Sequence, residues 1–171
     1  MKKILVIGSI SIDNVTYTSV LPEPGTTVYG ESFLSNIGGK GANQACAIHL
    51  LNGDVEFYGS VGDDDNGKRV QHFLKSVGLR ANLKISKENT GVASITIETQ
   101  TAENRIVIVP GSNMDITKED IDKIDFSKFD FLLFQLENPV DTICYAMRKA
   151  KDHVLFCLLL NCLLFNANCF F

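Results

Sequence analysis

Residues 36–45 of the 171-residue chain read Asn-Ile-Gly-Gly-Lys-Gly-Ala-Asn-Gln-Ala, and this stretch decides how the sequence is interpreted. The adjacent Gly38 and Gly39 permit tight or left-handed backbone conformations that other residues avoid. A helix is expected to begin at Lys40, and the first N–H groups of a helix have no partner within it. With Lys40 and Asn43, they offer donors to a small hydroxyl-rich or anionic ligand. A glycine-rich turn that merely starts a helix is the alternative at this point.

The composition is that of an ordinary globular protein, with 45% hydrophobic and 21% charged residues. The net charge of −4 and the lack of a basic cluster argue against nucleic-acid binding. Four apolar residues precede Gly8, fewer than the roughly 7–15 of a secretory signal. The five cysteines show no disulfide-framework spacing and no C-x-x-C motif. We therefore expect a cytoplasmic protein that has neither nucleic acid nor a membrane as its partner.

Strand-like and helix-like segments alternate along the chain. Apolar strand patterns occupy residues 3–8, 55–61 and 129–136, and helical periodicity follows at 40–51, 70–77 and from 139. This alternation predicts an α/β core with a parallel sheet. Further strand-like segments at 15–20, 26–33, 90–98 and 105–109 break the rhythm. We expect residues 1–153 to form one α/β domain, into which a small antiparallel lid is inserted at about 14–36 and 89–110.

Polar residues follow three predicted strands. Ser11 and Asp13 come after the first strand, Asp63–Asp65 after another, and Glu137 after residues 131–136. In open α/β sheets ligands bind outside the carboxyl ends of the strands, so Asp13, Glu137 and the glycine-rich loop are expected to share one crevice. A turn residue and a helix-start charge are the respective alternatives for the two carboxylates. Asp63–Asp65 is interpreted as a turn, and the three histidines as surface or core-edge residues rather than metal ligands or bases, so no metal site is expected.

Six short segments agree in order and spacing with one known family, between residue 3 and about residue 150. They are Gly8–Asp13, Pro24–Thr27, Gly38–Ala45, Gly62–Asp64, Thr90–Ala93 and Gln135–Glu137. On these segments the chain resembles the N-terminal half of the ribokinase branch of the PfkB carbohydrate kinase superfamily. The resemblance implies an incomplete ribokinase-like core of three α/β/α layers, which carries a small antiparallel β lid.

The resemblance also implies a substrate site for D-ribose. Asp13 looks like the residue that binds sugar hydroxyls, and Glu137 like the carboxylate that completes the site. Ser11 stands where the family usually has Asn, which puts the sugar preference in doubt; another pentose, a ketose or a nucleoside is the alternative substrate. The lid is expected to join two subunits in a homodimer. The implied substrate-binding set is Ser11, Asp13, Gly39, Lys40, Gly41, Asn43, Ala93, Ile95 and Glu137, with Ala93 and Ile95 as apolar lid contacts.

The family's phosphoryl-transfer machinery is not found in these 171 residues. Family members use ATP, magnesium and a monovalent cation, with a Gly-Ala-Gly-Asp motif, an Asn-x-x-Glu motif and a nucleotide loop, to phosphorylate the 5-hydroxyl of ribose. Gly53-Asp54 and Gly62-Asp63 lack the earlier glycine of the first motif. We therefore expect no catalytic residue in this chain and no kinase turnover by the chain alone. A non-catalytic fragment that dimerises through the lid, or that modulates an intact kinase, is the alternative function.

Residues 154–171 form an atypical apolar tail without a single charge. Residues 154–160 fit the next core strand. Beyond them the family would continue Asn-Pro-Ala-Pro, so we interpret the tail as the product of a frameshift, read-through or truncation. A membrane anchor is disfavoured because a span needs about 20 apolar residues and three asparagines interrupt this one.

Overall fold

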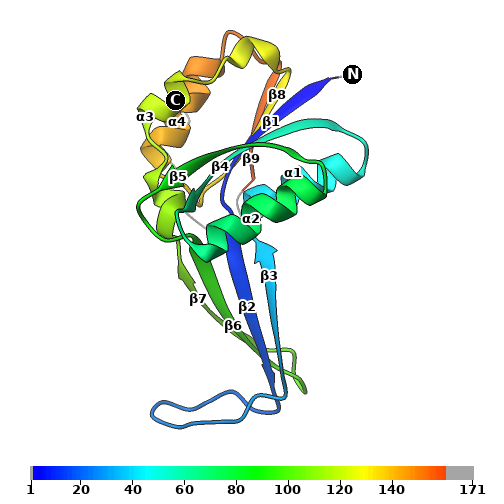
Figure 1. Ribbon diagram of the computed structural model, residues 1–171, viewed down its shortest axis with the longest axis vertical. Coiled ribbons are helices and arrows are strands. Elements are labelled where there is room, and N and C mark those ends of the chain that lie inside the picture. The colour runs from blue at the N-terminus through cyan, green and yellow to red at the C-terminus, as the bar shows by residue number, and fades with distance from the viewer. Residues whose placement is uncertain (1, 161–171) are drawn as a thin grey trace.

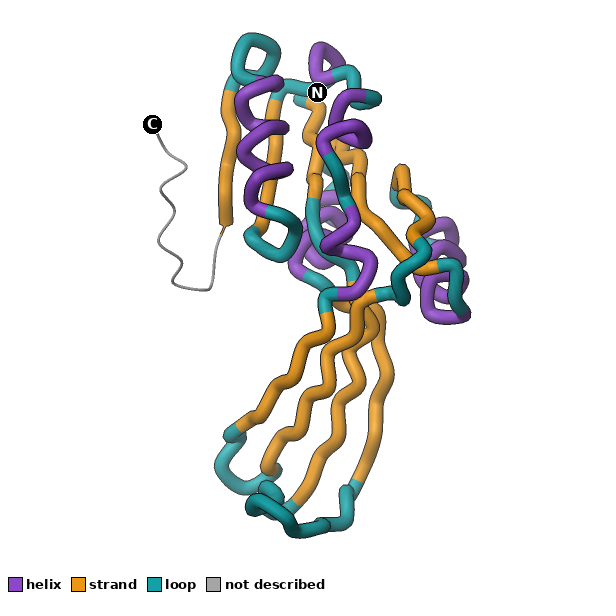
Figure 2. Tube along the Cα trace, turned by 90° about the vertical axis from the view of Figure 1, so that its left-hand side faces the viewer, coloured by secondary structure: helices purple, strands orange, loops and turns teal. Residues whose placement is uncertain are grey.

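The computed structural model describes residues 2–160, which form two β-sheets. One sheet lies inside a layered core, and the other projects from one end of it (Figures 1 and 2). All neighbouring strands of the core sheet are parallel, which confirms the predicted fold class. In spatial order these strands are β5 (Arg80–Ser86), β4 (Asp54–Gly62), β1 (Lys3–Ile7), β8 (Phe131–Gln135) and β9 (Phe156–Leu160).

Helices cover both faces of the core sheet, because its central strands are apolar on both sides. Along β1, Leu5 and Ile7 belong to the cluster that includes Ile121 and Ile143, whereas Val6 packs in the cluster of Ala45 and Leu74. Alternate side chains of one strand therefore serve two layers. The first layer holds α3 (Lys118–Asp122) and α4 (Val140–Ala150), with the short 3-10 turns η1 (Gly111–Asp115) and η2 (Phe126–Lys128) beside it; the second holds α1 (Lys40–Leu50) and α2 (Asp65–Ser76).

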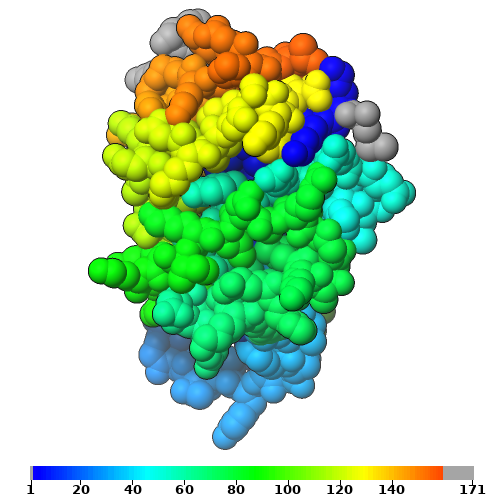
Figure 3. All heavy atoms as spheres, turned by 45° about the horizontal axis from the view of Figure 1, so that its top comes forward, coloured from blue at the N-terminus to red at the C-terminus, as the bar shows by residue number. Residues whose placement is uncertain are grey.

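The projecting sheet has the order β3 (Ser32–Gly38), β2 (Ser11–Thr18), β6 (Gly91–Glu98) and β7 (Asn104–Val109). We call these four strands the lid. The predicted small lid sheet is confirmed: its outer pairs, β2–β3 and β6–β7, are antiparallel, whereas its central pair, β2 and β6, runs parallel. The chain leaves the core along β2 and along β6 at the same place. It returns to the core along their antiparallel partners, β3 and β7. In the tilted view of Figure 3, green residues lie between the blue part of the chain at the bottom and the yellow and orange part at the top.

Two strands differ from the sequence-based expectation. Residues 26–31 lie outside any strand, because Pro24–Gly25 forms a turn in which Thr26 N donates to Glu23 O at 3.0 Å. The edge strand β5 was not predicted at all. β9 lies within residues 154–160, where a further core strand was considered, and pairs in parallel with β8. The rest of the predicted atypical tail, 161–171, is outside the described residues. None of the helices between residues 2 and 160 has the length and hydropathy that a membrane crossing requires.

Candidate functional site

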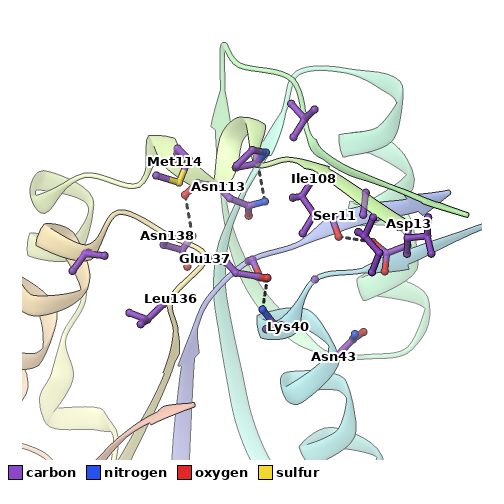
Figure 4. A pocket seen from close by; sticks show the side chains of 18 residues that line it. Ser11, Asp13, Lys40, Asn43, Ile108, Asn113, Met114, Leu136, Glu137 and Asn138 are labelled. Carbon is purple, nitrogen blue, oxygen red and sulfur yellow. Dashed lines mark hydrogen bonds and ion pairs between the residues drawn. The ribbon is translucent and has the colours of Figure 1, made fainter. Parts of the chain in front are cut away.

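A pocket of about 730 Å³ lies where the lid meets the carboxyl ends of the core strands (Figure 4). Its walls come from β2, β6 and β7 of the lid, from the start of α1, from η1 and from the segment after β8. Gly41 is the one member of the predicted substrate-binding set that does not line the pocket. The eight members that do are Ser11, Asp13, Gly39, Lys40, Asn43, Ala93, Ile95 and Glu137.

Glu137 holds a half-buried carboxylate at the core side of the pocket. Lys40 Nζ donates to its Oε1 at 2.6 Å, and Ser9 Oγ donates to its Oε2 at 2.5 Å. Burial opposes ionisation of Glu137, but the hydrogen bonds from Lys40 and Ser9 and the charge of Lys40 outweigh it and lower the pKa of this carboxyl. The pocket therefore contains a charged carboxylate whose two oxygens are oriented by separate elements, α1 and the end of β1.

Asp13 supplies the second carboxylate, from the lid side of the pocket. Ser11 Oγ donates to Asp13 Oδ1 at 2.7 Å, and both side chains project from the same face of β2 because they are two residues apart. The short side chain at position 11 thus orients Asp13 and occupies one of its two oxygens. Asp13 Oδ2 remains the oxygen that faces Gly38 on the neighbouring strand.

Two glycines fix how α1 begins. Gly39, at the N-cap of α1, has a φ of 92°, and a Cβ there would lie 2.5 Å from Ile10 Cα. A Cβ on Gly41 would lie 2.6 Å from the backbone of Gly8, so Gly41 lies between the helix and the end of β1. This close approach lets Ala42 N donate to Ser9 O at 3.0 Å. Gly39 and Gly41 therefore bring the first turn of α1 to the pocket.

The lid forms the apolar side of the pocket. Ala93 and Ile95 lie on one face of β6, and their partners across the sheet are Ile108 and Ile106 of β7. A ligand in the pocket thus meets carboxylates, an ammonium and an amide together with the aliphatic carbon of β6 and β7. That combination suits a molecule with hydroxyl groups on a carbon framework.

Sequence reasoning missed three polar residues of the pocket wall. Asn113 is buried, and its side chain accepts from Ile10 N at 2.9 Å and donates to Ile10 O at 2.7 Å, which fixes the chain between β1 and β2. Asn138 Nδ2 donates to Asn113 O at 2.9 Å (Figure 4). Ser9 lies inside the Gly8–Asp13 motif, so its position was available from the sequence, whereas nothing in the local pattern marks the two asparagines.

The donor set of the pocket does not fit the ATP and metal ions that the family resemblance implies. Among the described residues that line it, only Lys40 is cationic, and Lys40 is paired with Glu137. Residues 2–160 contain no group of three His, Cys, Asp or Glu side chains placed to hold a metal ion. In the Asp63–Asp65 segment, Asp64 caps α2 by accepting from Gly67 N at 2.7 Å, and it also accepts from Thr90 N at 2.8 Å. Asp63 and Asp64 thus form the bend and the N-cap before α2, and Asp65 is the first residue of that helix.

Comparison with known proteins agrees with the fold and with the motifs. Ribokinase of Schizosaccharomyces pombe is 36% identical over 90% of this chain and 51% of its own length. The structure of ribokinase from Giardia lamblia superposes with a TM-score of 0.83 at 30% identity, over 91% of this chain and 54% of that one. Arabidopsis thaliana ribokinase complexed with ribose and ATP superposes with a TM-score of 0.75 at 27% identity, over 91% and 53%.

The chain thus spans about half the length of the relatives it matches. The family model described as pfkB family carbohydrate kinase matches residues 1–164, a range that includes both sheets, the whole pocket and the first part of the apolar tail. With this match over most of its length, the chain belongs to the pfkB family of carbohydrate kinases.

Proposed function

We propose that this chain supplies the sugar-binding site and the lid of a ribokinase-like carbohydrate kinase. The observation that carries the proposal is the convergence of Asp13 from β2, Lys40 from α1 and Glu137 from the segment after β8 on one pocket. Ribokinases of several organisms are among its relatives, and the Arabidopsis structure is a complex with ribose. D-ribose is accordingly the proposed ligand.

The chemistry of the pocket matches a pentose. Each sugar hydroxyl both donates and accepts, so carboxylates can accept from two neighbouring hydroxyls while an ammonium or amide donates to a third. Asp13 and Glu137 take the accepting role, and Lys40 and Asn43 the donating one. Ser11 orients Asp13, and the two glycines Gly39 and Gly41 bring the first turn of α1 to the pocket. Ala93 and Ile95 cover the carbon face of the ring. The polar contacts set orientation, and the apolar lid excludes water.

The phosphoryl-transfer step belongs to a complete family member. ATP and magnesium, when bound there, supply the phosphoryl group and the charge neutralisation for transfer to the 5-hydroxyl; a monovalent cation is also implied by the family. Positioning and electrostatic stabilisation provide nearly all catalysis of this kind. Because the pocket residues of this chain do not fit those groups, we propose that the 171 residues alone bind ribose without phosphorylating it.

Two measurements on the purified chain test the proposal. Titration calorimetry with D-ribose is expected to give saturable binding, which the Asp13→Asn variant weakens and the Asp63→Asn variant leaves unchanged, since Asp63 is exposed and outside the pocket. A coupled assay for ADP formation with ATP, magnesium and ribose is expected to show no turnover. Absence of saturable binding would overturn the ribose assignment, and clear turnover would overturn the inactivity.

A non-catalytic role as a lid-mediated dimer, or as a modulator of an intact kinase, is the second candidate. It is favoured by large apolar side chains exposed on the lid, among them Phe33, Leu34, Ile106 and Ile108. Such side chains gathered on one projecting sheet are typical of a protein–protein contact. A second copy of this chain is the proposed partner, because an isologous contact uses the same surface on both subunits.

A further inference from the structure

Ser9, which was not among the predicted ligand residues, connects its own segment after β1 with the Glu137 loop and with the start of α1. It lies between β1 and β2, lines the pocket and is 3% exposed. Its Oγ donates to Glu137 Oε2 at 2.5 Å, and its carbonyl oxygen accepts from Ala42 N at 3.0 Å. One residue thus binds both the loop that carries Glu137 and the first turn of α1.

We propose that Ser9 is a positioning residue for sugar binding, whose hydroxyl holds the Glu137 carboxylate in one orientation and in its charged form. The proposal rests on the proposed function, since Glu137 acts here as an acceptor for sugar hydroxyls. Lys40 and Ser9 approach different oxygens of the same carboxylate, Oε1 and Oε2. With both donors present, rotation of the carboxylate would break at least one short hydrogen bond.

The two donors differ in what they do for a ligand. Lys40 is about one third exposed, and its ammonium can exchange Glu137 for a sugar hydroxyl or for water. The Ser9 hydroxyl is buried against the start of α1, where its oxygen accepts from Gly41 N at 3.5 Å while it donates its proton to Glu137. Preorganised acceptors bind more tightly because the cost of ordering them is met before the ligand arrives. Ser9 therefore fixes the carboxylate while Lys40 stays available to the ligand.

Removing the Ser9 hydroxyl is expected to raise the pKa of Glu137. A donor to a carboxylate stabilises its charged form, and Ser9 is one of the groups that lower this pKa. The other charged side chains that line the pocket within the described residues are Lys40, from α1, and Asp13, from β2. Both remain in a Ser9→Ala variant, so a difference in titration between the two proteins isolates the hydroxyl.

The first test needs no ligand. The carboxyl carbon of Glu137 is titrated by NMR in the unsubstituted chain, in Ser9→Ala and in Ser60→Ala. Ser60 is also a fully buried serine, but its Oγ has no hydrogen-bond partner among the described residues and it is not part of the pocket lining. The pKa of Glu137 is expected to rise in Ser9→Ala and to stay unchanged in Ser60→Ala. An unchanged pKa in Ser9→Ala overturns the proposal.

The second test measures ribose binding as a function of pH. At neutral pH, Ser9→Ala is expected to bind ribose about tenfold more weakly, the order of one lost hydrogen bond to a charged group. Because the pKa of Glu137 rises, binding is also lost at a higher pH on acidification than in the unsubstituted chain. Equal affinity and an equal pH profile in Ser9→Ala contradict the positioning role.

Two further arms keep the test decisive. Should Ser9→Ala fail to fold, Ser9→Cys retains a small side chain with a weaker donor and is expected to raise the pKa of Glu137 as well. Should the unsubstituted chain fail to bind ribose, the proposed function falls, whereas the ligand-free titration still decides whether Ser9 controls Glu137.

Discussion

The carboxylate of Asp13 fills the space beside Gly38 that a side chain would otherwise take. A Cβ on Gly38 would lie 2.0 Å from Asp13 Oδ2 and 2.3 Å from its Cγ. The two residues lie on adjacent lid strands, in a register that pairs Gly38 with Ser11 and Asp13 with Asn36. Ser11 holds the other oxygen of the carboxylate. Gly38 therefore determines where the lid places its single carboxylate in the pocket.

Replacement of Gly38 by alanine is expected to displace Asp13 and to weaken ribose binding by at least about tenfold, the order of one lost charge-assisted contact. The free energy of unfolding should fall by about 1–3 kcal/mol, as for other overpacked sites. Titration calorimetry and urea denaturation measure the two effects. Ser32→Ala, at the exposed far end of the same strand, serves as the control and should change neither. Unchanged ribose affinity in Gly38→Ala would show that Asp13 does not bind the sugar.

The ion pair of Lys40 and Glu137 is expected to couple the two residues energetically. Their side chains are 31% and 23% exposed and approach to 2.6 Å. In a double-mutant cycle of Lys40→Met and Glu137→Gln, each single variant should lose about 1–2 kcal/mol of unfolding free energy, because each leaves a half-buried polar partner behind. The double variant should lose less than their sum.

The pair Lys68 and Asp65 provides a matched control for this cycle. Its atoms lie 3.1 Å apart, but the side chains are 70% and 99% exposed. Solvent screening should leave no resolvable coupling energy for such a helical surface pair. Equal coupling energies in the two cycles would mean that the pocket does not strengthen the Lys40–Glu137 contact.

Asp120 is expected to make the stability of the core depend on pH. Burial opposes its ionisation, but hydrogen bonds from Lys84, Thr117 and Lys123 outweigh burial and hold the pKa of Asp120 far below its ordinary 3.8. A lowered pKa in the folded state gives stability that is present in full above the unfolded-state pKa and is lost as the pH falls below it. The Asp120→Asn variant should therefore lose about 3 kcal/mol of unfolding free energy at pH 7, since the substitution leaves Lys84 without its closest carboxylate.

The difference in unfolding free energy between Asp120→Asn and the unsubstituted chain should become smaller below pH 3.8. At that pH Asp120 begins to be protonated in the unfolded chain. Denaturant titrations at pH 7, 5 and 3 measure this trend. Asp152→Asn replaces an exposed aspartate and should show no loss at any of these values. A loss of stability in Asp120→Asn that stays constant over the whole range would contradict the role of ionised Asp120.

The convergence of the site was predictable from the sequence because it follows from sheet topology. Asp13, Lys40 and Glu137 all follow β-strands or a glycine-rich turn, and the ends of such strands meet at one edge of the sheet. The glycines around Lys40 predicted a close backbone approach. The structure shows it where Gly39 lies against Ile10 and Gly41 against Gly8. Strong local patterns were therefore sufficient for the pieces of the pocket that lie beside regular elements.

The remaining features depend on contacts that no local pattern encodes. β5, at the sheet edge, is an exception, because Ala81, Leu83 and Ile85 alternate with polar residues in the period-2 pattern of a strand, so this strand could have been predicted. The parallel pairing of β2 with β6 joins segments about 80 residues apart in the sequence. It follows from the place at which both strands leave the core. Asn113 acts across 103 residues on Ile10. Long-range backbone contacts of this kind are invisible to sequence periodicity.

Dimerisation through the lid is expected to use the face that looks toward the pocket. The register of the lid places Leu34, Val15, Ile95 and Ile106 in one row across all four strands of this face. The corresponding row on the opposite face reads Ser35, Asn14, Ser94 and Val107. Leu34 and Ile106, at the two ends of the apolar row, are 48% and 49% exposed. Packing against the same row of a second copy would remove this apolar surface from water.

Sedimentation of the purified chain should therefore reveal a dimer. Leu34→Glu places a charge within the apolar row and should yield monomers at the same protein concentration, since burying an unpaired carboxylate is costly. Ser94→Glu adds the same charge at an exposed position on the opposite face and should leave the dimer intact. Equal disruption by both variants would place the contact elsewhere on the lid. A chain that sediments as a monomer before any substitution would exclude self-association through this sheet, because both copies carry an identical apolar row.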